Sequence, residues 1–140
     1  MKNFVLTIAF LFSTALVFSQ SYFNFAGIGF SYCDITDKNV DIASFLKSGP
    51  VGNVMTSDGF NHFEINLDDK TFTHRYAGDE EGVKDVSKIT NVVKTKDYVK
   101  FNVKTNDFGD LTCVISLNGN FKSEFIVKYK DGNKTEVAFY

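Results

Sequence analysis

The sequence lacks tryptophan and contains only one proline, two cysteines and two histidines. Two cysteines are too few for a disulfide-dense small protein or a four-thiolate zinc site, and two histidines are too few for a three-histidine metal centre. Scarce proline and an aromatic content of 16% exclude a collagen-like or typically disordered chain. Neither sign of charge predominates, since 15 basic and 17 acidic residues leave a net charge of -2. We therefore expect no metal, no cofactor and no nucleic-acid partner.

Residues 1–19 resemble a secretory signal peptide. Lys2 provides a short positive region, an apolar stretch follows, and Val17 and Ser19 are small residues at the positions that a signal peptidase reads. The apolar run is shorter than the roughly 20 residues that a transmembrane helix needs. We expect cleavage after Ser19, one all-β domain over residues 20–140, and a secreted or periplasmic location.

Beyond the signal, apolar residues alternate with polar ones, and Gly, Asn or Asp separate the runs, which is the pattern of antiparallel strands. The exception is a helical pattern near residues 39–47 that ends at a Gly-Pro pair. The runs expected to be strands are 60–67, 70–77, 86–94, 98–105, 110–117, 121–130 and 134–140, with 51–56 and part of 22–33 adding two more. The sequence thus predicts a meander of about seven to nine strands that forms an up-and-down barrel or, alternatively, a β-sandwich.

Side-chain parity sets the predicted hairpins, because a one-residue slip moves every apolar side chain to the other face of the sheet. An even-numbered turn at the first hairpin pairs Phe63 with His74, and a three-residue loop at 131–133 pairs Val127 with Val137. The predicted buried face comprises Phe63, Ile65, Leu67, Phe72, Tyr76, Ile89, Val93, Val99, Phe101, Val103, Leu111, Ile115, Phe125, Val127, Val137 and Phe139.

In size, export signal and meander the chain resembles the lipocalin-type barrels, which hold small apolar ligands. The resemblance is one of architecture, because the early Gly-x-Trp element of that family is absent from a chain without tryptophan. No residue role is carried over from the family. Most of the expected strands are shorter than the roughly 9–11 residues that a transmembrane strand needs, so we do not expect the domain to span a membrane.

The two cysteines, Cys33 and Cys113, are an even pair in a domain expected to be exported, and one disulfide is the simplest prediction. A bridge closing about 80 residues would stabilise the fold by roughly 4–5 kcal/mol on the chain-entropy model. The alternative is two separate buried thiols.

His74 falls on the predicted inner face, where it would serve either as a core histidine or as a polar contact for a ligand. No serine or cysteine has the sequence context of an activated nucleophile, so we assign no catalytic residue. The residues predicted to line a pocket are Phe63, Phe72, His74, Tyr76, Phe101 and Phe125.

Lysines are concentrated between residues 84 and 104, and four of them share one predicted outer face. These lysines are Lys88, Lys94, Lys100 and Lys104. Such a face could bind an anionic glycan, a lipid headgroup or an acidic protein, or could be an ordinary solvated surface. Asp110 on the next strand is expected opposite Lys104 and would weaken the local positive potential.

These observations predict a non-catalytic binding or interaction protein. Its partner would be a protein or glycan of the cell envelope or the extracellular space, held on the outer surface. An alternative is a carrier with a small apolar ligand inside the barrel, and an enzyme that motif analysis fails to reveal is the third. Sequence alone does not measure the interior volume that separates the first two hypotheses.

Overall fold

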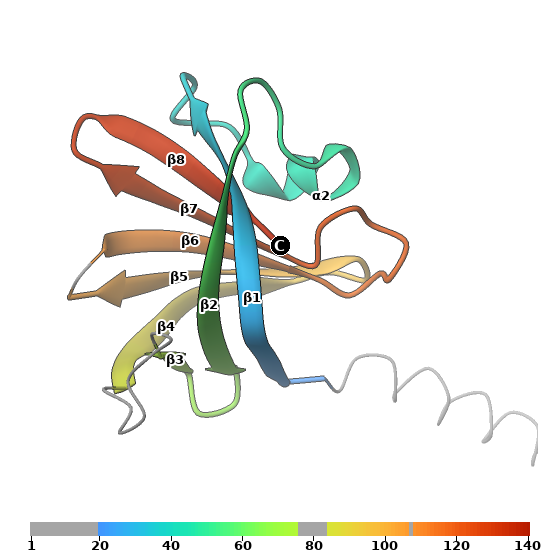
Figure 1. Cartoon of the computed structure of the whole chain (residues 1–140). Coiled ribbons are helices and arrows are strands. Elements are labelled where there is room, and N and C mark those ends of the chain that lie inside the picture. Colours follow the sequence, from blue (N-terminus) through green and yellow to red (C-terminus); the bar gives the residue numbers. More distant parts are fainter. Residues whose placement is uncertain (1–19, 76–83, 107) are drawn as a thin grey trace, which may run out of the picture.

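The computed structural model describes residues 20–75, 84–106 and 108–140, which form a closed barrel of eight antiparallel strands (Figure 1). The strands are β1 (Tyr22–Ile35), β2 (Met55–Asn66), β3 (Thr71–Arg75), β4 (Lys84–Lys94), β5 (Tyr98–Thr105), β6 (Gly109–Ser116), β7 (Phe125–Asp131) and β8 (Lys134–Phe139). Each strand pairs with the next one along the chain, and β8 pairs with β1. The predicted up-and-down barrel is confirmed, and the sandwich alternative is wrong.

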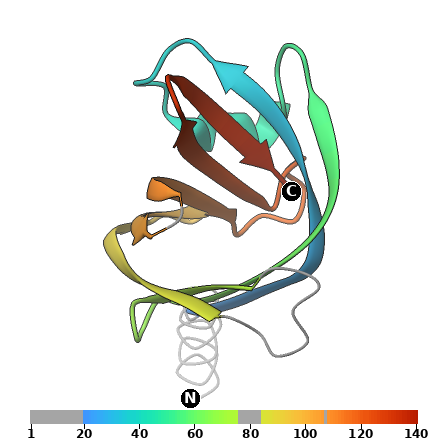
Figure 2. The same ribbon diagram turned by 60° about the vertical axis from the view of Figure 1, so that its left-hand side comes forward.

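Strand β1 closes the barrel, because its first half pairs with β2 alone and its second half also pairs with β8. The strand runs along the whole barrel and bends in its middle (Figure 2). At the bend the register with β2 shifts between Phe25 and Ile28, and Gly27 has a φ of 65°. Such a bulge inserts an extra residue and increases the local twist. Phe25 and Ile28 therefore both belong to the inner core, although an unbroken alternation would place them on opposite faces.

The barrel interior is packed with aromatic and aliphatic side chains that alternate along the strands as predicted. Phe72, Phe101 and Phe125 are fully buried, and the Phe25 ring stacks on Phe125 with their centroids 4.9 Å apart. The predicted pairing of Phe63 with His74 across β2 and β3 is confirmed. Most predicted core residues lie in this inner cluster, which sets the position of the cavity described below.

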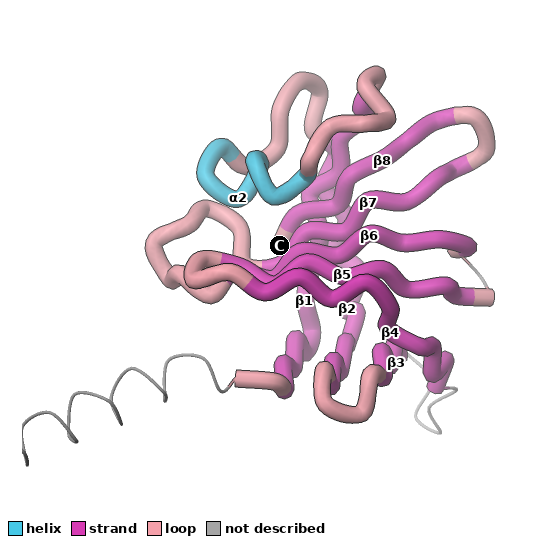
Figure 3. Tube along the Cα trace, turned by 180° about the vertical axis from the view of Figure 1, so that it is seen from behind, coloured by secondary structure: helices cyan, strands magenta, loops and turns pink. Residues whose placement is uncertain are grey.

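A second apolar cluster lies outside the barrel wall. Two short helical turns cover this part of the wall (Figure 3). These turns are η1 (Ile42–Ser44) and α2 (Phe45–Ser48), close to the predicted helix. Ile42 and Leu46 are buried against the outward-facing side chains of Val114, Ile126 and Phe139. Asp41 caps the first turn by accepting a hydrogen bond from the Ala43 backbone N–H at 3.3 Å. Neither helical turn could cross a bilayer, and the described residues contain no other helix.

The predicted register of the last hairpin is wrong. Asp131 pairs with Lys134 across a two-residue turn, so Val127 faces Ala138 rather than Val137. Gly132 has a φ of 58°, which suits the first central position of a two-residue hairpin turn. Val137 and Phe139 belong to the outer cluster. The parity argument failed because it allowed only one buried face, whereas the helical segment buries the outer face of β8 as well.

The predicted disulfide is also wrong, since Cys33 and Cys113 are both free and buried. Cys113 points into the barrel, while Cys33 belongs to the cluster outside it. The barrel wall thus separates the two sulfur atoms, and a disulfide needs Cβ vectors that face each other across a short distance. The alternative of two separate buried thiols is the one that the structure has.

We expect both thiols to be detected as free cysteine, and only after unfolding. Burial raises the pKa of the Cys113 thiol, so its reactive thiolate does not form in the folded protein near pH 8. Labelling with a thiol reagent, followed by mass spectrometry, should modify Cys113 in denaturant and spare it in native buffer. A melting temperature that falls on addition of reductant would contradict the structure.

We expect Gly27→Ala to destabilise the barrel by about 1–2 kcal/mol, because an alanine at positive φ is strained. A Cβ at Gly27 would meet no atom within 4 Å, so the cost comes from the backbone alone. Gly119→Ala is the matched control, since a Cβ there also meets nothing and its φ is not positive. Denaturant unfolding of both variants checks this, and equal stabilities would contradict the role assigned to the bulge.

Candidate ligand-binding cavity

A cavity of about 110 Å³ lies inside the barrel, near the end at which β3 and β5 finish. It is open to solvent on one side. Most of its wall is apolar, and side chains from every strand of the barrel contribute. The lining residues are Phe30, Tyr32, Asn61, Phe63, Phe72, His74, Asp85, Thr105, Phe108, Leu111, Val127, Tyr129 and Ala138.

Aromatic rings surround the cavity on several sides. The ring of His74 stacks on that of Phe63, with centroids 4.5 Å apart and ring planes 5° from parallel. Phe108 approaches from the loop between β5 and β6, with its centroid 6.0 Å from His74 and 6.5 Å from Tyr129. Phe108 is 41% exposed, so its ring forms the outer edge of the cavity rather than part of the core. These contacts make the mouth of the cavity a largely aromatic surface.

His74 is held in one orientation inside the wall. It is only 6% exposed, and its Nε2 lies 3.1 Å from Oδ1 of Asn61 on β2. The alternation of β3 brings both Phe72 and His74 to the inner face. The stacked Phe63 ring and the Asn61 amide together orient the imidazole, so it forms part of the cavity wall.

Tyr129 adds a second polar group near the mouth. Its hydroxyl donates a hydrogen bond to Oε2 of Glu136 at 2.6 Å, across the β7–β8 pair. Burial raises the pKa of Tyr129, and the hydrogen bond and negative charge of Glu136 raise it further. The phenol therefore stays protonated across the physiological pH range, with its proton directed at the carboxylate.

Asp85 is the acidic residue in the cavity lining. It lies directly opposite His74 in the β3–β4 pair and is partly buried. Among the described residues no hydrogen bond or ion pair engages its carboxylate, and its oxygens are not among the buried polar atoms left without a partner. Water therefore reaches this carboxylate, and a ligand group in the cavity would replace that water.

Three of the residues predicted to line a pocket do line the cavity, namely Phe63, Phe72 and His74. Phe101 and Phe125 are instead fully buried in the core. Tyr76 lies outside the described residues.

Sequence analysis missed the lining residues of β1, the β5–β6 loop and β7. An inner-face pattern does mark Val127 and Tyr129, which alternate with Lys128. No local pattern marks Phe108 or Asp85 as cavity residues, because their positions depend on strands that lie far away in the sequence.

The four lysines of the predicted basic patch lie on the outer surface of β4 and β5, and several contact oxygen atoms of the protein. Lys100 forms an ion pair with Asp41 at 3.3 Å, and Lys94 donates to the Gln20 carbonyl oxygen at 3.0 Å. Lys104 lies opposite Asp110, as expected, and Lys88 lies opposite Thr71. The ion pair of Lys100 with Asp41, together with the position of Asp110 opposite Lys104, reduces the positive potential of the face.

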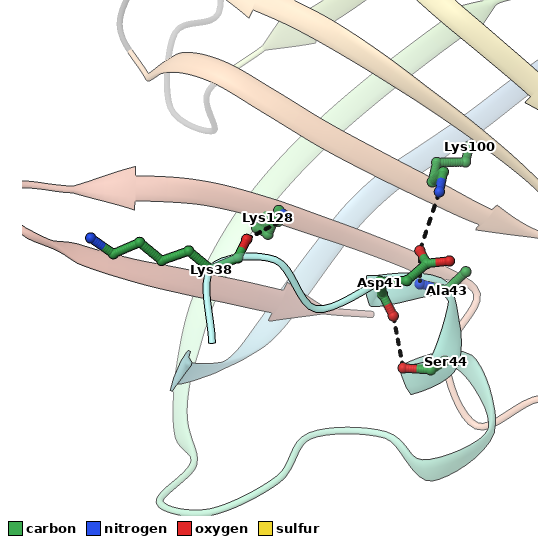
Figure 4. A network of polar contacts seen from close by, with 6 residues as sticks. All are labelled: Lys38, Asp41, Ala43, Ser44, Lys100 and Lys128. Atoms are coloured by element: carbon green, nitrogen blue, oxygen red, sulfur yellow. Dashed lines mark hydrogen bonds and ion pairs between the residues drawn. The ribbon is translucent and has the colours of Figure 1, made fainter. Parts of the chain in front are cut away.

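Figure 4 shows how lysines hold the helical segment to the barrel. Lys100 contacts Asp41, and Lys128 donates to the carbonyl oxygen of Lys38 at 3.3 Å. Lys100 therefore supports the turn that begins η1 as well as facing solvent.

Among the described residues, no group of three or more His, Cys, Asp or Glu side chains is arranged to hold a metal ion.

Comparison of the chain with protein-family models, with curated proteins and with solved structures finds no significant match.

We expect neutral His74 to be the Nε2–H tautomer, because Nε2 faces the carbonyl oxygen of Asn61. Long-range ¹H–¹⁵N correlation spectra distinguish the two tautomers directly. Asn61→Ala should weaken this preference and destabilise the fold by about 1 kcal/mol, the usual cost of one such hydrogen bond. Observation of the Nδ1–H tautomer in the unmodified protein would contradict the geometry described.

Proposed function

We propose that this protein is a non-catalytic binding protein that takes a small, mainly apolar molecule into the open end of its barrel. The supporting observation is the cavity itself: it is aromatic, connected to solvent and lined by a few polar groups. Ligand sites commonly combine an apolar wall with a small number of placed polar groups. The cavity favours the carrier hypothesis over binding on the outer surface, where two of the four lysines already contact the protein's own oxygen atoms.

The size of the cavity limits what it could hold. At about 110 Å³ it is far smaller than the roughly 300–1,000 Å³ of pockets that enclose drug-sized ligands. It is also somewhat smaller than an engineered cavity of about 150 Å³ that binds benzene in another protein. We therefore propose that one end group of the ligand enters, and that the remainder lies at the mouth beside Phe108.

Binding is favoured over catalysis by the state of the polar groups. The His74 ring is stacked on Phe63, and its Nε2 is engaged by Asn61. The Tyr129 proton is directed at Glu136. Both groups are thus organised as parts of a wall. Secretion remains a prediction from residues 1–19, and the binding proposal does not depend on it.

The test is a methyl NMR titration of the purified protein with small aromatic and aliphatic alcohols. We expect shift changes confined to the cavity methyls of Leu111, Val127 and Ala138, with the outer methyls of Ile126 and Val137 as internal controls. Val127→Phe should fill the cavity and abolish these changes. Native mass spectrometry of protein from its own host should also detect a retained small molecule.

Two outcomes would contradict the proposal. One is the absence of cavity shifts at millimolar probe concentrations. The other is an unchanged response in a folded Val127→Phe variant, because a ligand inside the barrel must compete with the added ring. Circular dichroism distinguishes a filled barrel from an unfolded one.

A further inference from the structure

We infer that the ligand group held in the cavity is an organic ammonium cation. This inference rests on the proposed function and names the chemical class of its ligand. It is carried by a carboxylate in the cavity wall, the aromatic faces around the cavity, and the absence of lysine and arginine from the described lining residues.

The carboxylate of Asp85 supplies the charge. It lines the cavity and is partly buried, and its oxygens are not among the buried polar atoms left without a partner in the described residues. A partly buried carboxylate attracts a cation more strongly than one in bulk water, because less solvent screens its charge. A cation in the cavity would therefore be attracted to Asp85, whereas a carboxylate or phosphate would be repelled.

The aromatic rings supply the second attraction. A cation within about 6 Å of a ring centroid is attracted to the negative face of the ring, most strongly where water is excluded. Tyr32, Phe108 and Tyr129 lie among the rings of the lining, near the mouth. Because Tyr129 donates its proton to Glu136, the phenol becomes more electron-rich and its attraction for a cation increases.

The charges around the cavity also favour a positively charged ligand. Among the side chains that the structure describes, no lysine or arginine lines the cavity. Glu136 adds a carboxylate close behind Tyr129. At the rim, Lys134 forms an ion pair with Asp34 at 3.2 Å, so its charge is offset by a neighbouring carboxylate. Alkylammonium head groups are also small, which suits a volume of about 110 Å³.

The test compares choline with its neutral isostere 3,3-dimethyl-1-butanol, using the NMR titration of the unmodified protein. The two probes have the same shape and hydroxyl group and differ in charge. We expect choline to bind at least about tenfold more tightly, which is the ratio that one desolvated cation–π contact provides. Tetramethylammonium should compete with choline for the same cavity methyls.

Asp85→Asn should weaken choline binding by about fivefold to tenfold and leave the binding of the neutral isostere within about twofold. Asp110→Asn is the matched control, because it removes the same charge from an exposed position opposite Lys104. This control should change neither affinity. The direct comparison of probes on the unmodified protein does not require any variant to fold.

The outcomes separate the two proposals. If the neutral isostere binds as tightly as choline, or if Asp110→Asn weakens choline binding as much as Asp85→Asn does, the ammonium inference is wrong while the cavity remains a binding site. If neither probe nor any of the alcohols shifts the cavity methyls, the proposed function itself is wrong.

Discussion

The pairing of β1 with both β2 and β8 is the interaction on which the rest of the structure depends. Closure leaves no unpaired edge, and it converts alternation along each strand into an inside and an outside. To reach both neighbours, β1 must bend, and the bulge at Gly27 provides the bend while keeping Phe25 and Ile28 on the inside. Without this extra residue, the second half of β1 would turn Phe30 and Tyr32 outward and Ser31 and Cys33 toward the core.

Closure buries the inner face of β7 and β8, and the helical turns bury the outer face. The inner side chains complete the barrel core, and the outer ones pack under the helical turns. Buried apolar surface outside the wall stabilises the helical segment, which is too short to persist alone. Because this outer cluster also stabilises the fold, the inner face of β7 and β8 does not need to be packed with apolar side chains along its whole length.

The interior changes character from one end to the other. Around Phe101 and Phe125 the side chains fill the barrel completely, as the zero exposure of these residues indicates. Toward the ends of β3 and β5, phenylalanine gives way to His74, Tyr129 and Asp85, and packing leaves a cavity. The cavity end therefore combines aromatic rings with a few polar groups. The proposed ammonium group would lie there, beside Asp85 and Tyr129.

Local alternation determined much of this protein from sequence alone. It located the strands from residue 60 onward, placed the helical turns, and set His74 beside Phe63 on the inner face. These features follow from neighbours along one strand or across one tight turn. The same reasoning did not predict the pairing of Val127 with Ala138. Parity fixes the register only if one face of each strand is buried, and both faces of β8 are buried.

Tertiary structure alone decided the closure of the barrel, the separation of Cys33 from Cys113, and the cavity. Each depends on which distant segments meet: the helical segment on the outer wall, β1 against β8, and the β5–β6 loop over β3. Alternation defines the two sides of a strand but carries no information about what covers either side. A cavity is the volume that packed side chains fail to fill, so it exists only once all of the walls are in place.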